Sequence, residues 1–206
     1  MMDTRSLGIP TRQSAFDYDR TVIAFHGTTK EAAERLVRGV PFARSENNDD
    51  WLGHGIYFWE YAPQQAWWWA ERRYGEEAAV VDALVRLGRC LDLLDPANAR
   101  LLVEAHSDLV RVLAESGERA KSNANAHKYL DCAVFNYLFE KLERRGIGTD
   151  SARAMFMPHR AGGMVRLWDR SGVFQGAHIQ LSVREPNNIL AVWHLRKDGR
   201  YGRDGQ

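Results

Sequence analysis

Hydrophobic and polar positions near the start of the chain predict a strand followed by a helix. The β-branched and apolar run 21–25 leads directly into His26, which suggests a strand that ends in a polar side chain. Thr28 or Thr29 can cap the next helix, whose apolar residues recur at helical spacing until Gly39 supplies the stop. His26 is therefore expected at a strand-to-helix corner.

A glycine-flanked segment then predicts a second strand. Gly53 and Gly55 allow the backbone to turn tightly before the short run 56–58. Side chains alternate between the two faces of a strand, so Tyr57 and Phe58 lie on opposite faces. We expect Phe58 in the sheet core and Tyr57 at the wall of a cleft.

Three consecutive tryptophans, Trp67, Trp68 and Trp69, occupy the helix predicted next. Steps of about 100° around a helix place them on different faces, so all three cannot be buried. At least one should be exposed or meet a ligand. We expect Trp68 to be the candidate for ligand contact and Trp67 or Trp69 to pack against the sheet.

The rest of the chain alternates strands and helices. Its predicted strands are 79–88 and 177–184, and its predicted helices lie within 97–115 and 124–144. This pattern predicts one α+β domain over residues 1–206 with a helical insertion at approximately 96–150. The polar segment 115–125 between the two helices has two interpretations, a loop that reaches over a pocket or recognises a partner, and a hydrophilic connector.

Composition adds limits to this picture. A chain of 206 residues with 45% apolar content can bury a sizeable core. Its formal net charge of +1 gives no global attraction for nucleic acid, although Arg38 and Arg44, or the tail 196–203, could form a local basic groove. Cys90 and Cys132, each in an apolar context, are expected to be buried free thiols in a reducing compartment.

Targeting and metal signals are weak throughout the sequence. The first 20 residues lack the apolar stretch of a signal peptide, and no run approaches the roughly 18 apolar residues of a membrane span. We therefore expect a cytoplasmic protein without a membrane partner. The seven histidines are scattered and no cysteine pair accompanies them, so no metal site is expected.

The order of these pieces carries a family resemblance. The segments that match are His26-Gly27-Thr28, 53–58, 65–68, 79–88 with its closing Leu-Gly, and 177–184 followed by 188–190. Each is weak alone, but five in this order resemble the ADP-ribosyltransferase fold, in its poly(ADP-ribose) polymerase and diphtheria-toxin-like branch. The resemblance covers roughly residues 20–95 and 160–195. It implies a split, mainly antiparallel sheet that forms an NAD cleft.

The resemblance also implies a reaction and a set of contacts. NAD is cleaved at the nicotinamide–ribose bond through an oxocarbenium-like state, which the enzyme must stabilise. In the family, the backbone of the residue matching Gly27 binds the nicotinamide amide, and the matching histidine, here His26, hydrogen-bonds a ribose hydroxyl. Thr28 completes this binding motif.

Aromatic side chains are implied as the walls of the pocket. Tyr57 matches the residue that stacks on the nicotinamide ring, and Trp68 matches a second aromatic wall, a contact worth about 0.5–1.5 kcal/mol beyond area burial. Gln65 stands where the family often has a serine that touches the amide. This difference leaves the role of Gln65 open.

The third catalytic position departs from the family's polymerases, since Gln180 stands where they have glutamate. Glutamine keeps a hydrogen bond but loses the charge, so the His-Tyr-Gln set favours transfer of a single unit over polymer synthesis. The carboxylates of Glu60, Asp150, Asp169 and Glu185 are alternatives that could fold in beside it.

Plainer structural roles remain open for the same residues. His26 could be a satisfied structural histidine, and Gln180 could lie on the solvent face of a strand. In the family, the loop entering the last catalytic strand contacts the acceptor, which makes Phe174 and Gln175 candidates for acceptor recognition.

The sequence thus predicts an NAD-dependent mono-ADP-ribosyltransferase that modifies a macromolecular acceptor, either protein or nucleic acid, as a toxin or defence effector. NAD is its expected substrate, and no metal is needed. The alternatives are an NAD glycohydrolase and a catalytically silent module that binds NAD or ADP-ribose.

Overall fold

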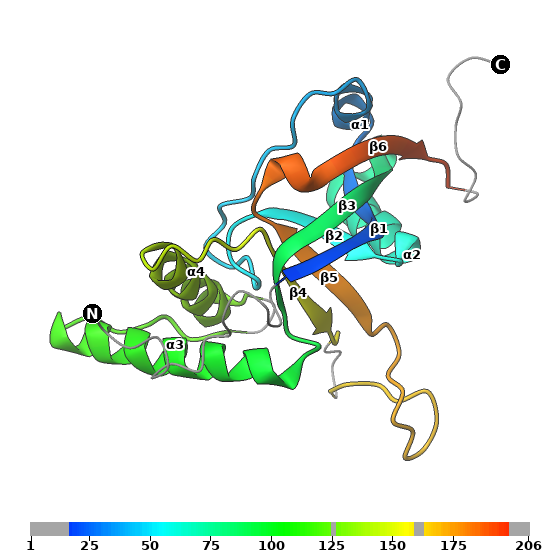
Figure 1. Cartoon of the computed structure of the whole chain (residues 1–206). Coiled ribbons are helices and arrows are strands. Elements are labelled where there is room, and N and C mark those ends of the chain that lie inside the picture. The colour runs from blue at the N-terminus through cyan, green and yellow to red at the C-terminus, as the bar shows by residue number, and fades with distance from the viewer. Residues whose placement is uncertain (1–16, 125–126, 159–162, 198–206) are drawn as a thin grey trace.

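A computed structural model describes residues 17–124, 127–158 and 163–197 of the chain. Within these residues, six strands and four helices build an α+β fold (Figure 1). In chain order the elements are β1 (Asp17–Thr29), α1 (Lys30–Val37), β2 (Ile56–Glu60), α2 (Pro63–Tyr74), the 3-10 turn η2 (Gly75–Glu77), β3 (Ala78–Asp92), α3 (Pro96–Glu115), α4 (Tyr129–Glu143), β4 (Ser151–Phe156), β5 (His178–Val183), the 3-10 turn η3 (Pro186–Asn188) and β6 (Ile189–Leu195). The predicted α+β class is confirmed.

All six strands belong to one mixed sheet in the order β1-β2-β5-β4-β3-β6, with a further pairing between β1 and β3. Five of the six strand pairings are antiparallel, and β3 pairs with β4 in parallel. The parallel pairing is possible because the chain passes through α3 and α4 before it returns as β4. The sheet is therefore mixed, although most of its pairings are antiparallel as predicted.

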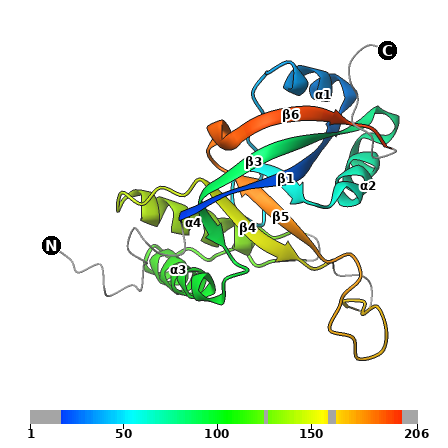
Figure 2. The same cartoon turned by 45° about the vertical axis from the view of Figure 1, so that its right-hand side comes forward.

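The sheet consists of two three-stranded parts, β1-β3-β6 and β2-β5-β4, that are joined by short ladders (Figure 2). β1 and β2 share only two residue pairs, and β3 and β4 share only three. Side chains from both parts meet in one buried cluster, which includes Val22, Phe58, Val85 and Leu181. Burying this cluster holds the two parts together, at roughly 1.5–3 kcal/mol for each large apolar side chain.

The two helices predicted between the central strands are present as α3 and α4. Asp95 caps α3, since its side chain accepts from the Ala97 amide, and Pro96 occupies the first turn. Leu101 of α3 and Phe139 of α4 belong to one buried cluster that extends onto β3 and β4. The helix pair therefore covers one end of the sheet, away from α1 and α2 (Figure 1).

Several local predictions are confirmed. The Thr29 side chain accepts from the Ala32 amide at 3.2 Å and caps α1, and Gly39 ends that helix with φ +90°. Cys90 and Cys132 are both free and buried.

The described residues show neither a membrane-spanning helix nor a metal-binding group. No helix there is both long and apolar enough to cross a membrane. In the same part of the chain, no group of three or more His, Cys, Asp or Glu residues is arranged to hold a metal ion.

Candidate functional site

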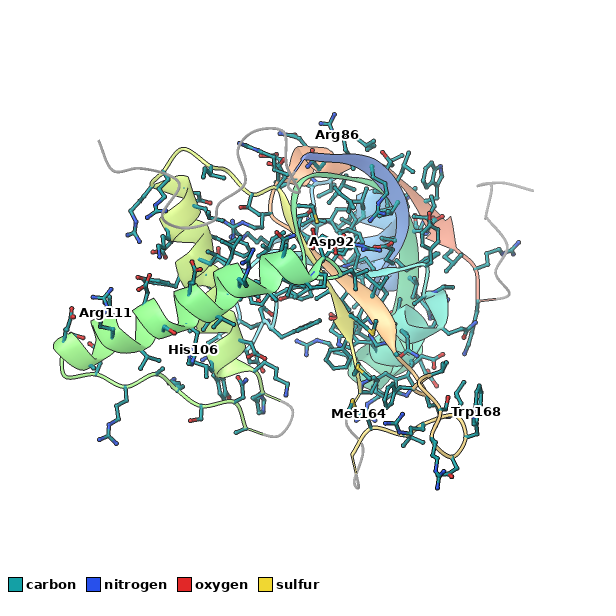
Figure 3. All side chains as sticks on the ribbon, turned by 60° about the horizontal axis from the view of Figure 1, so that its bottom comes forward. Arg86, Asp92, His106, Arg111, Met164 and Trp168 are labelled. Atoms are coloured by element: carbon teal, nitrogen blue, oxygen red, sulfur yellow. The ribbon has the colours of Figure 1, made fainter. Side chains whose placement is uncertain are left out.

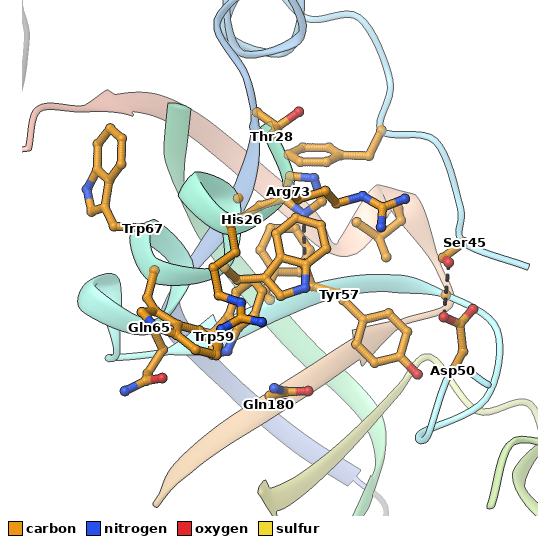
Figure 4. A pocket seen from close by; sticks show the side chains of 18 of the residues that line it. His26, Thr28, Ser45, Asp50, Tyr57, Trp59, Gln65, Trp67, Arg73 and Gln180 are labelled. Atoms are coloured by element: carbon orange, nitrogen blue, oxygen red, sulfur yellow. Dashed lines mark hydrogen bonds between the residues drawn. The ribbon is translucent and has the colours of Figure 1, made fainter. Parts of the chain in front are cut away.

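A cleft of about 1680 Å³ lies between the end of β1, the segment 40–51, β2, α2 and β5 (Figure 4). Small-molecule pockets usually measure about 300–1000 Å³, so this cleft exceeds the space that one such ligand needs. It is lined by all seven residues predicted to form the site, which are His26, Gly27, Thr28, Tyr57, Gln65, Trp68 and Gln180.

The cleft begins where β1 and β2 separate. Their ladder ends at the pair Phe25↔Trp59, and its continuation would pair Gly27 with Tyr57. Instead, the Nδ1 atom of His26 lies 2.8 Å from the Tyr57 carbonyl oxygen. A carbonyl can only accept, so Nδ1 carries the proton and the ring satisfies the group that the ladder leaves behind. The imidazole therefore stands between the two strands.

This separation leaves one edge of β1 uncovered. The Tyr61 amide donates to the Ile23 carbonyl at 3.2 Å, which shows that the backbone polar groups of Ile23 face β2. The two-residue repeat of a strand puts the N–H and C=O of Gly27 on the same edge. Because β2 has turned away by that point, these groups face the cleft.

The small size of Gly27 serves a second contact that the sequence did not indicate. A Cβ atom there would lie 2.9 Å from the Ala66 carbonyl oxygen and 3.0 Å from the Trp69 ring, both in α2. Glycine therefore lets α2 pack directly against β1, in addition to any close approach by a ligand.

The His26 ring packs against two phenylalanines. Its Nε2 atom is the ring nitrogen that does not bond to Tyr57. Its centroid lies 5.2 Å from that of Phe42 and 5.5 Å from that of Phe58. Burial lowers the pKa of His26, and the hydrogen bond to Tyr57 opposes this shift only in part. The ring is thus a neutral imidazole whose Nε2 accepts hydrogen bonds. Thr28 follows on the same face of β1 and is buried beside it.

Tyr57 forms a fixed wall of the cleft. Its hydroxyl donates to the Gly53 carbonyl at 2.8 Å and accepts from the Leu52 amide at 2.9 Å. Burial raises the pKa of Tyr57 well above its ordinary value, so the phenol stays protonated. Phe58 is fully buried in the core, as the alternation predicted. The Tyr57 hydroxyl is therefore held by two hydrogen bonds, and stacking of its ring on a ligand stays a prediction.

Both glycines of the Gly53-His54-Gly55 turn are required by close neighbours. Gly53 has φ +75°, and a Cβ atom on it would lie 2.8 Å from the Asn136 side chain of α4. A Cβ atom on Gly55 would overlap the Ser182 side chain of β5. The turn that positions Tyr57 therefore depends on contacts with two elements far away in the sequence.

The three tryptophans of α2 divide their roles as the helical pattern predicted. Trp69 packs with its ring centroid 5.6 Å from that of Trp59, and Trp67 is half-buried in the same cluster. Trp68 is 56% exposed, and the Arg72 guanidinium lies 4.8 Å from its ring. Exposure of at least one tryptophan is confirmed, and ligand contact by Trp68 stays a prediction.

Charged side chains around the cleft give it a basic character. The predicted basic residue Arg44 lines the cleft and donates to the His54 carbonyl, whereas Arg38 pairs with Glu34 on the exposed side of α1. Six basic and three acidic side chains line the cleft, although the whole chain carries only +1. They are Arg35, Arg44, Arg72, Arg73, Lys128 and Lys197, and Asp49, Asp50 and Glu71.

Gln180 lies in the centre of β5, beside Trp59 of β2 and Ala154 of β4. Its Oε1 atom accepts from the Trp51 indole at 2.6 Å, and its Nε2 atom lies 3.1 Å from Nε2 of His178. The side chain therefore faces the cleft and not bulk solvent. Sequence analysis did not assign Trp51 or His178 to the site, although His178 is two residues from Gln180 and must share its face of the strand.

None of the four carboxylates that could substitute for a catalytic glutamate lines the cleft. The first of them, Glu60, is part of a buried ion-pair cluster. Arg153 donates to both oxygens of Glu60, at 2.6 and 2.7 Å, and to Asp92 at 2.9 Å. All three side chains are buried, and they join β2, β4 and β3. Glu60 therefore serves the interior of the sheet.

The remaining three also lie outside the cleft lining. Asp150 accepts from the Arg89 amide at 2.8 Å, and Glu185 accepts from an amide in the η3 turn that follows it. Asp169 is exposed and lies 3.5 Å from Arg170. The structure therefore brings none of these three to Gln180.

Asp50 is a cleft-lining carboxylate that sequence reasoning did not single out. Its side chain accepts from the Ser45 hydroxyl at 3.1 Å and from the Asn47 amide at 3.0 Å (Figure 4). Burial raises the pKa of Asp50, and these hydrogen bonds oppose the shift. Asp50 thus fixes the loop that forms one rim of the cleft.

The segment before β5 lies beside the cleft. Phe174 packs under the Arg166 guanidinium at 4.8 Å, and the Gln175 amide donates to the Val165 carbonyl at 2.8 Å. Met164 and Trp168 of this segment lie on a loop that projects from the body (Figure 3). Phe174 and Gln175 are not among the cleft-lining residues, so their role in acceptor recognition stays a prediction.

The polar connector between α3 and α4 acts in part as a helix cap. Asn123 accepts from the Leu130 amide at 2.9 Å at the start of α4. Lys128 lines the cleft, while residue 125 of the connector lies outside the described residues. The described part of the segment 115–125 favours its interpretation as a hydrophilic connector. Lys128, which directly precedes α4, is the residue of this region that lines the cleft.

Comparisons with protein-family models, curated proteins and solved structures found no match to this chain. A fold by itself does not establish an activity, whereas the geometry and chemistry of a cleft limit what it can bind.

Proposed function

We propose that the chain is an NAD-dependent mono-ADP-ribosyltransferase that acts on a macromolecular acceptor. The observation that carries this proposal is the uncovered backbone edge at Gly27, next to the Tyr57 ring and the Nε2 atom of His26. A carboxamide offers N–H donors and one carbonyl acceptor, which complement the C=O and N–H of a single residue. Nicotinamide bound to Gly27 would therefore be held in one orientation.

The other cleft residues suit the rest of NAD. The neutral His26 ring can accept a hydrogen bond from a ribose hydroxyl, and the Tyr57 ring can stack on nicotinamide. Trp68 would supply a second aromatic surface, with Gln65 beside it in α2. Arginines such as Arg73 favour a diphosphate through charge-assisted hydrogen bonds. The volume of the cleft leaves room for an acceptor next to NAD.

Gln180 serves the reaction through hydrogen bonds and not through charge or proton transfer. The nicotinamide–ribose bond breaks with its electron pair moving to the nicotinamide nitrogen, and an acceptor nucleophile then bonds to the ribose anomeric carbon. Gln180 can hydrogen-bond the ribose but cannot take the proton of the acceptor. Transfer of one unit is therefore favoured, and the acceptor's proton passes to another group or to water.

A silent NAD-binding module is the second candidate function, and one observation favours it. Trp51 and His178 already hydrogen-bond both ends of the Gln180 amide. Position 180 also lacks the carboxylate that would stabilise positive charge on the ribose. Glycohydrolase activity is the intermediate case, in which water replaces the acceptor. The proposal also places the chain in the cytoplasm, which the buried free thiols of Cys90 and Cys132 support.

The test is incubation of purified protein with NAD labelled in its ADP-ribose part and with separate pools of protein, RNA and DNA. Tyr57→Ala removes the stacking wall, and Tyr61→Ala removes an exposed tyrosine that does not line the cleft. Nicotinamide release with label on one pool, lost in Tyr57→Ala and kept in Tyr61→Ala, is the expected result.

Other outcomes would replace the proposal. Nicotinamide release that leaves every pool unlabelled would indicate a glycohydrolase. NAD binding without any release would identify a silent module, and no binding would remove NAD from the account.

A further inference from the structure

Trp51, Gln180 and His178 form one continuous row of hydrogen bonds beside the cleft. The Trp51 indole nitrogen lies 2.6 Å from Oε1 of Gln180, whose Nε2 lies 3.1 Å from Nε2 of His178. The row ends at the Gly176 carbonyl oxygen, 2.7 Å from Nδ1 of His178. These residues come from the segment before β2 and from the start of β5, so only the folded chain brings them together.

The chemistry of the groups fixes the direction of every bond in the row. An indole N–H can only donate, so the atom of Gln180 next to Trp51 must be the carbonyl oxygen. The amide nitrogen then faces His178, and because it can only donate, Nε2 of His178 must accept. Nδ1 of His178 carries the proton and donates to Gly176. The row is therefore complete only when the His178 imidazole is neutral.

The surroundings of His178 keep it neutral. Its ring centroid lies 5.3 Å from that of Phe156, its partner in β4, and the next position on the same face of β5 is Gln180, whose partners are Ala154 and Trp59. None of these residues titrates. Burial lowers the pKa of His178, and the Gly176 carbonyl opposes that shift. The charged side chains that line the same cleft are Arg35, Arg44, Asp49, Asp50, Glu71, Arg72, Arg73, Lys128 and Lys197.

We propose that Trp51 and His178 are positioning residues that hold the Gln180 amide in one orientation, and that protonation of His178 releases it. This inference rests on the proposed function, because it gives the held amide a ribose to contact. In the neutral row, Gln180 keeps one N–H and one carbonyl lone pair for the ligand. A protonated His178 carries a hydrogen on Nε2 that faces the amide N–H₂. The amide must then turn, which removes the acceptor from Trp51.

The activity test uses the full chain and three variants. Trp51→Phe removes the indole N–H donor and keeps an aromatic ring, and His178→Phe removes the acceptor and keeps a ring beside Phe156. His106→Gln is a control on the exposed face of α3 (Figure 3). Nicotinamide release and NAD affinity are measured from about pH 5 to pH 8. We expect turnover to fall about 10- to 100-fold in Trp51→Phe and His178→Phe with NAD affinity unchanged, as for a misplaced catalytic group.

The pH profile separates positioning from a purely structural role. The wild type and His106→Gln should lose turnover on the acid side of neutrality. This acid limb should be smaller in His178→Phe, where His26 is the cleft histidine that still titrates. If wild type turns over and His178→Phe has the same turnover and the same acid limb, the inference is overturned while the proposed function stands.

A second measurement does not depend on turnover. The indole proton resonance of Trp51, assigned by its absence in Trp51→Phe, is followed by NMR while the pH is lowered. We expect it to shift as His178 protonates and to be insensitive to pH in His178→Phe. The inference would be overturned if the Trp51 resonance did not shift while His178 became protonated. If the wild type releases no nicotinamide, the proposed function fails and this titration alone decides whether the row exists.

Discussion

Gln180 is already hydrogen-bonded at both ends of its amide before any ligand binds. Trp51 holds the carbonyl oxygen and His178 receives the amide nitrogen. A glutamate at this place would keep the bond to Trp51 but put its second oxygen against an unprotonated Nε2. The residue at position 180 and the protonation state of His178 are therefore coupled.

Gln180→Glu is predicted to raise the rate of nicotinamide release by about tenfold or more, because a carboxylate stabilises positive charge at the anomeric carbon. The new charge should also raise the pKa of His178, since an opposite charge favours the imidazolium. Release is measured against pH, with Gln64→Glu as a control that adds the same charge elsewhere on the cleft lining. An equal response in both variants would show that position 180 has no special role.

Tyr57→Phe is predicted to cost about 1–3 kcal/mol of unfolding free energy, because it removes the acceptor of the Leu52 amide and the shorter of two hydrogen bonds to the Gly53 carbonyl. The ring remains, so NAD affinity should change little, whereas Tyr57→Ala should weaken it. Denaturant unfolding and NAD titration of both variants check this. If Tyr57→Phe lost as much NAD affinity as Tyr57→Ala, the hydroxyl and not the ring would be the binding group.

At the scale of the elements, the separation of β1 from β2 creates the site. The His26 ring satisfies the Tyr57 carbonyl that the ladder leaves behind, so opening the sheet leaves that carbonyl paired. At the end of β2, the buried ion pairs of Arg153 with Glu60 and Asp92 tie β2, β4 and β3 together. An open edge next to a firmly tied interior is suited to a preorganised binding site.

Arg153→Leu is predicted to reduce the unfolding free energy by about 3–5 kcal/mol, because it removes the ion-pair partner of the buried Glu60 and the nearer of the two arginines beside the buried Asp92. Arg111→Leu is the matched control. Arg111 pairs with Asp108 and Glu115 on the exposed end of α3 (Figure 3), and water screens such pairs so that they contribute little to stability. Equal losses in the two variants, measured by denaturant unfolding, would contradict the interior role of Arg153.

Over the whole molecule, the helix pair and the cleft occupy different parts of the sheet. α3 and α4 cover one end of the sheet (Figure 1). The cleft opens where β1 leaves β2 beside α2. Two histidines at this cleft, His26 and His178, have pKa values lowered by burial. The stability of the whole chain should therefore depend on pH.

Stability is predicted to fall as the pH drops below about 6.5. The folded chain disfavours the imidazolium of His178, so below the ordinary pKa of 6.5 the unfolded chain binds more protons. This contribution is fully present above that pH and is lost on acidification. Asp50 and Asp82, whose pKa values are raised by burial, act in the opposite sense. A comparison with His178→Phe therefore isolates the histidine.

Thermal unfolding of wild type and His178→Phe, at a series of pH values on both sides of 6.5, checks this prediction. The wild-type midpoint should fall more on acidification than the midpoint of the variant. Parallel curves would mean that His178 titrates alike in the folded and unfolded chain.

Local signals in the sequence predicted much of the fold. Thr29 caps α1, Gly39 ends it, and alternation places Phe58 in the core and Tyr57 at the cleft. These features depend on a residue and its near neighbours, so they can be predicted without the tertiary structure. The parallel pairing of β3 with β4 was not predicted, because it depends on where two inserted helices return the chain.

The candidate site was predicted unevenly for the same reason. All seven predicted residues line one cleft, since the order of their motifs follows the order of the elements that form it. Trp51 and Asp50 were not assigned roles, and the carboxylate of Glu60 proved to belong to Arg153. These pairings join residues distant in sequence, so neither spacing nor propensity reveals them.

The sequence by itself determined the helices and most of the strands, although not β4, and which residue types meet at the cleft, because short-range backbone and side-chain preferences govern these features. Tertiary structure alone decided that His26 replaces a ladder bond to Tyr57, that Gly27 makes room for α2, and that Trp51 and His178 hold Gln180. The direction and strength of such contacts follow from distances between atoms, and those distances exist only once the chain has folded.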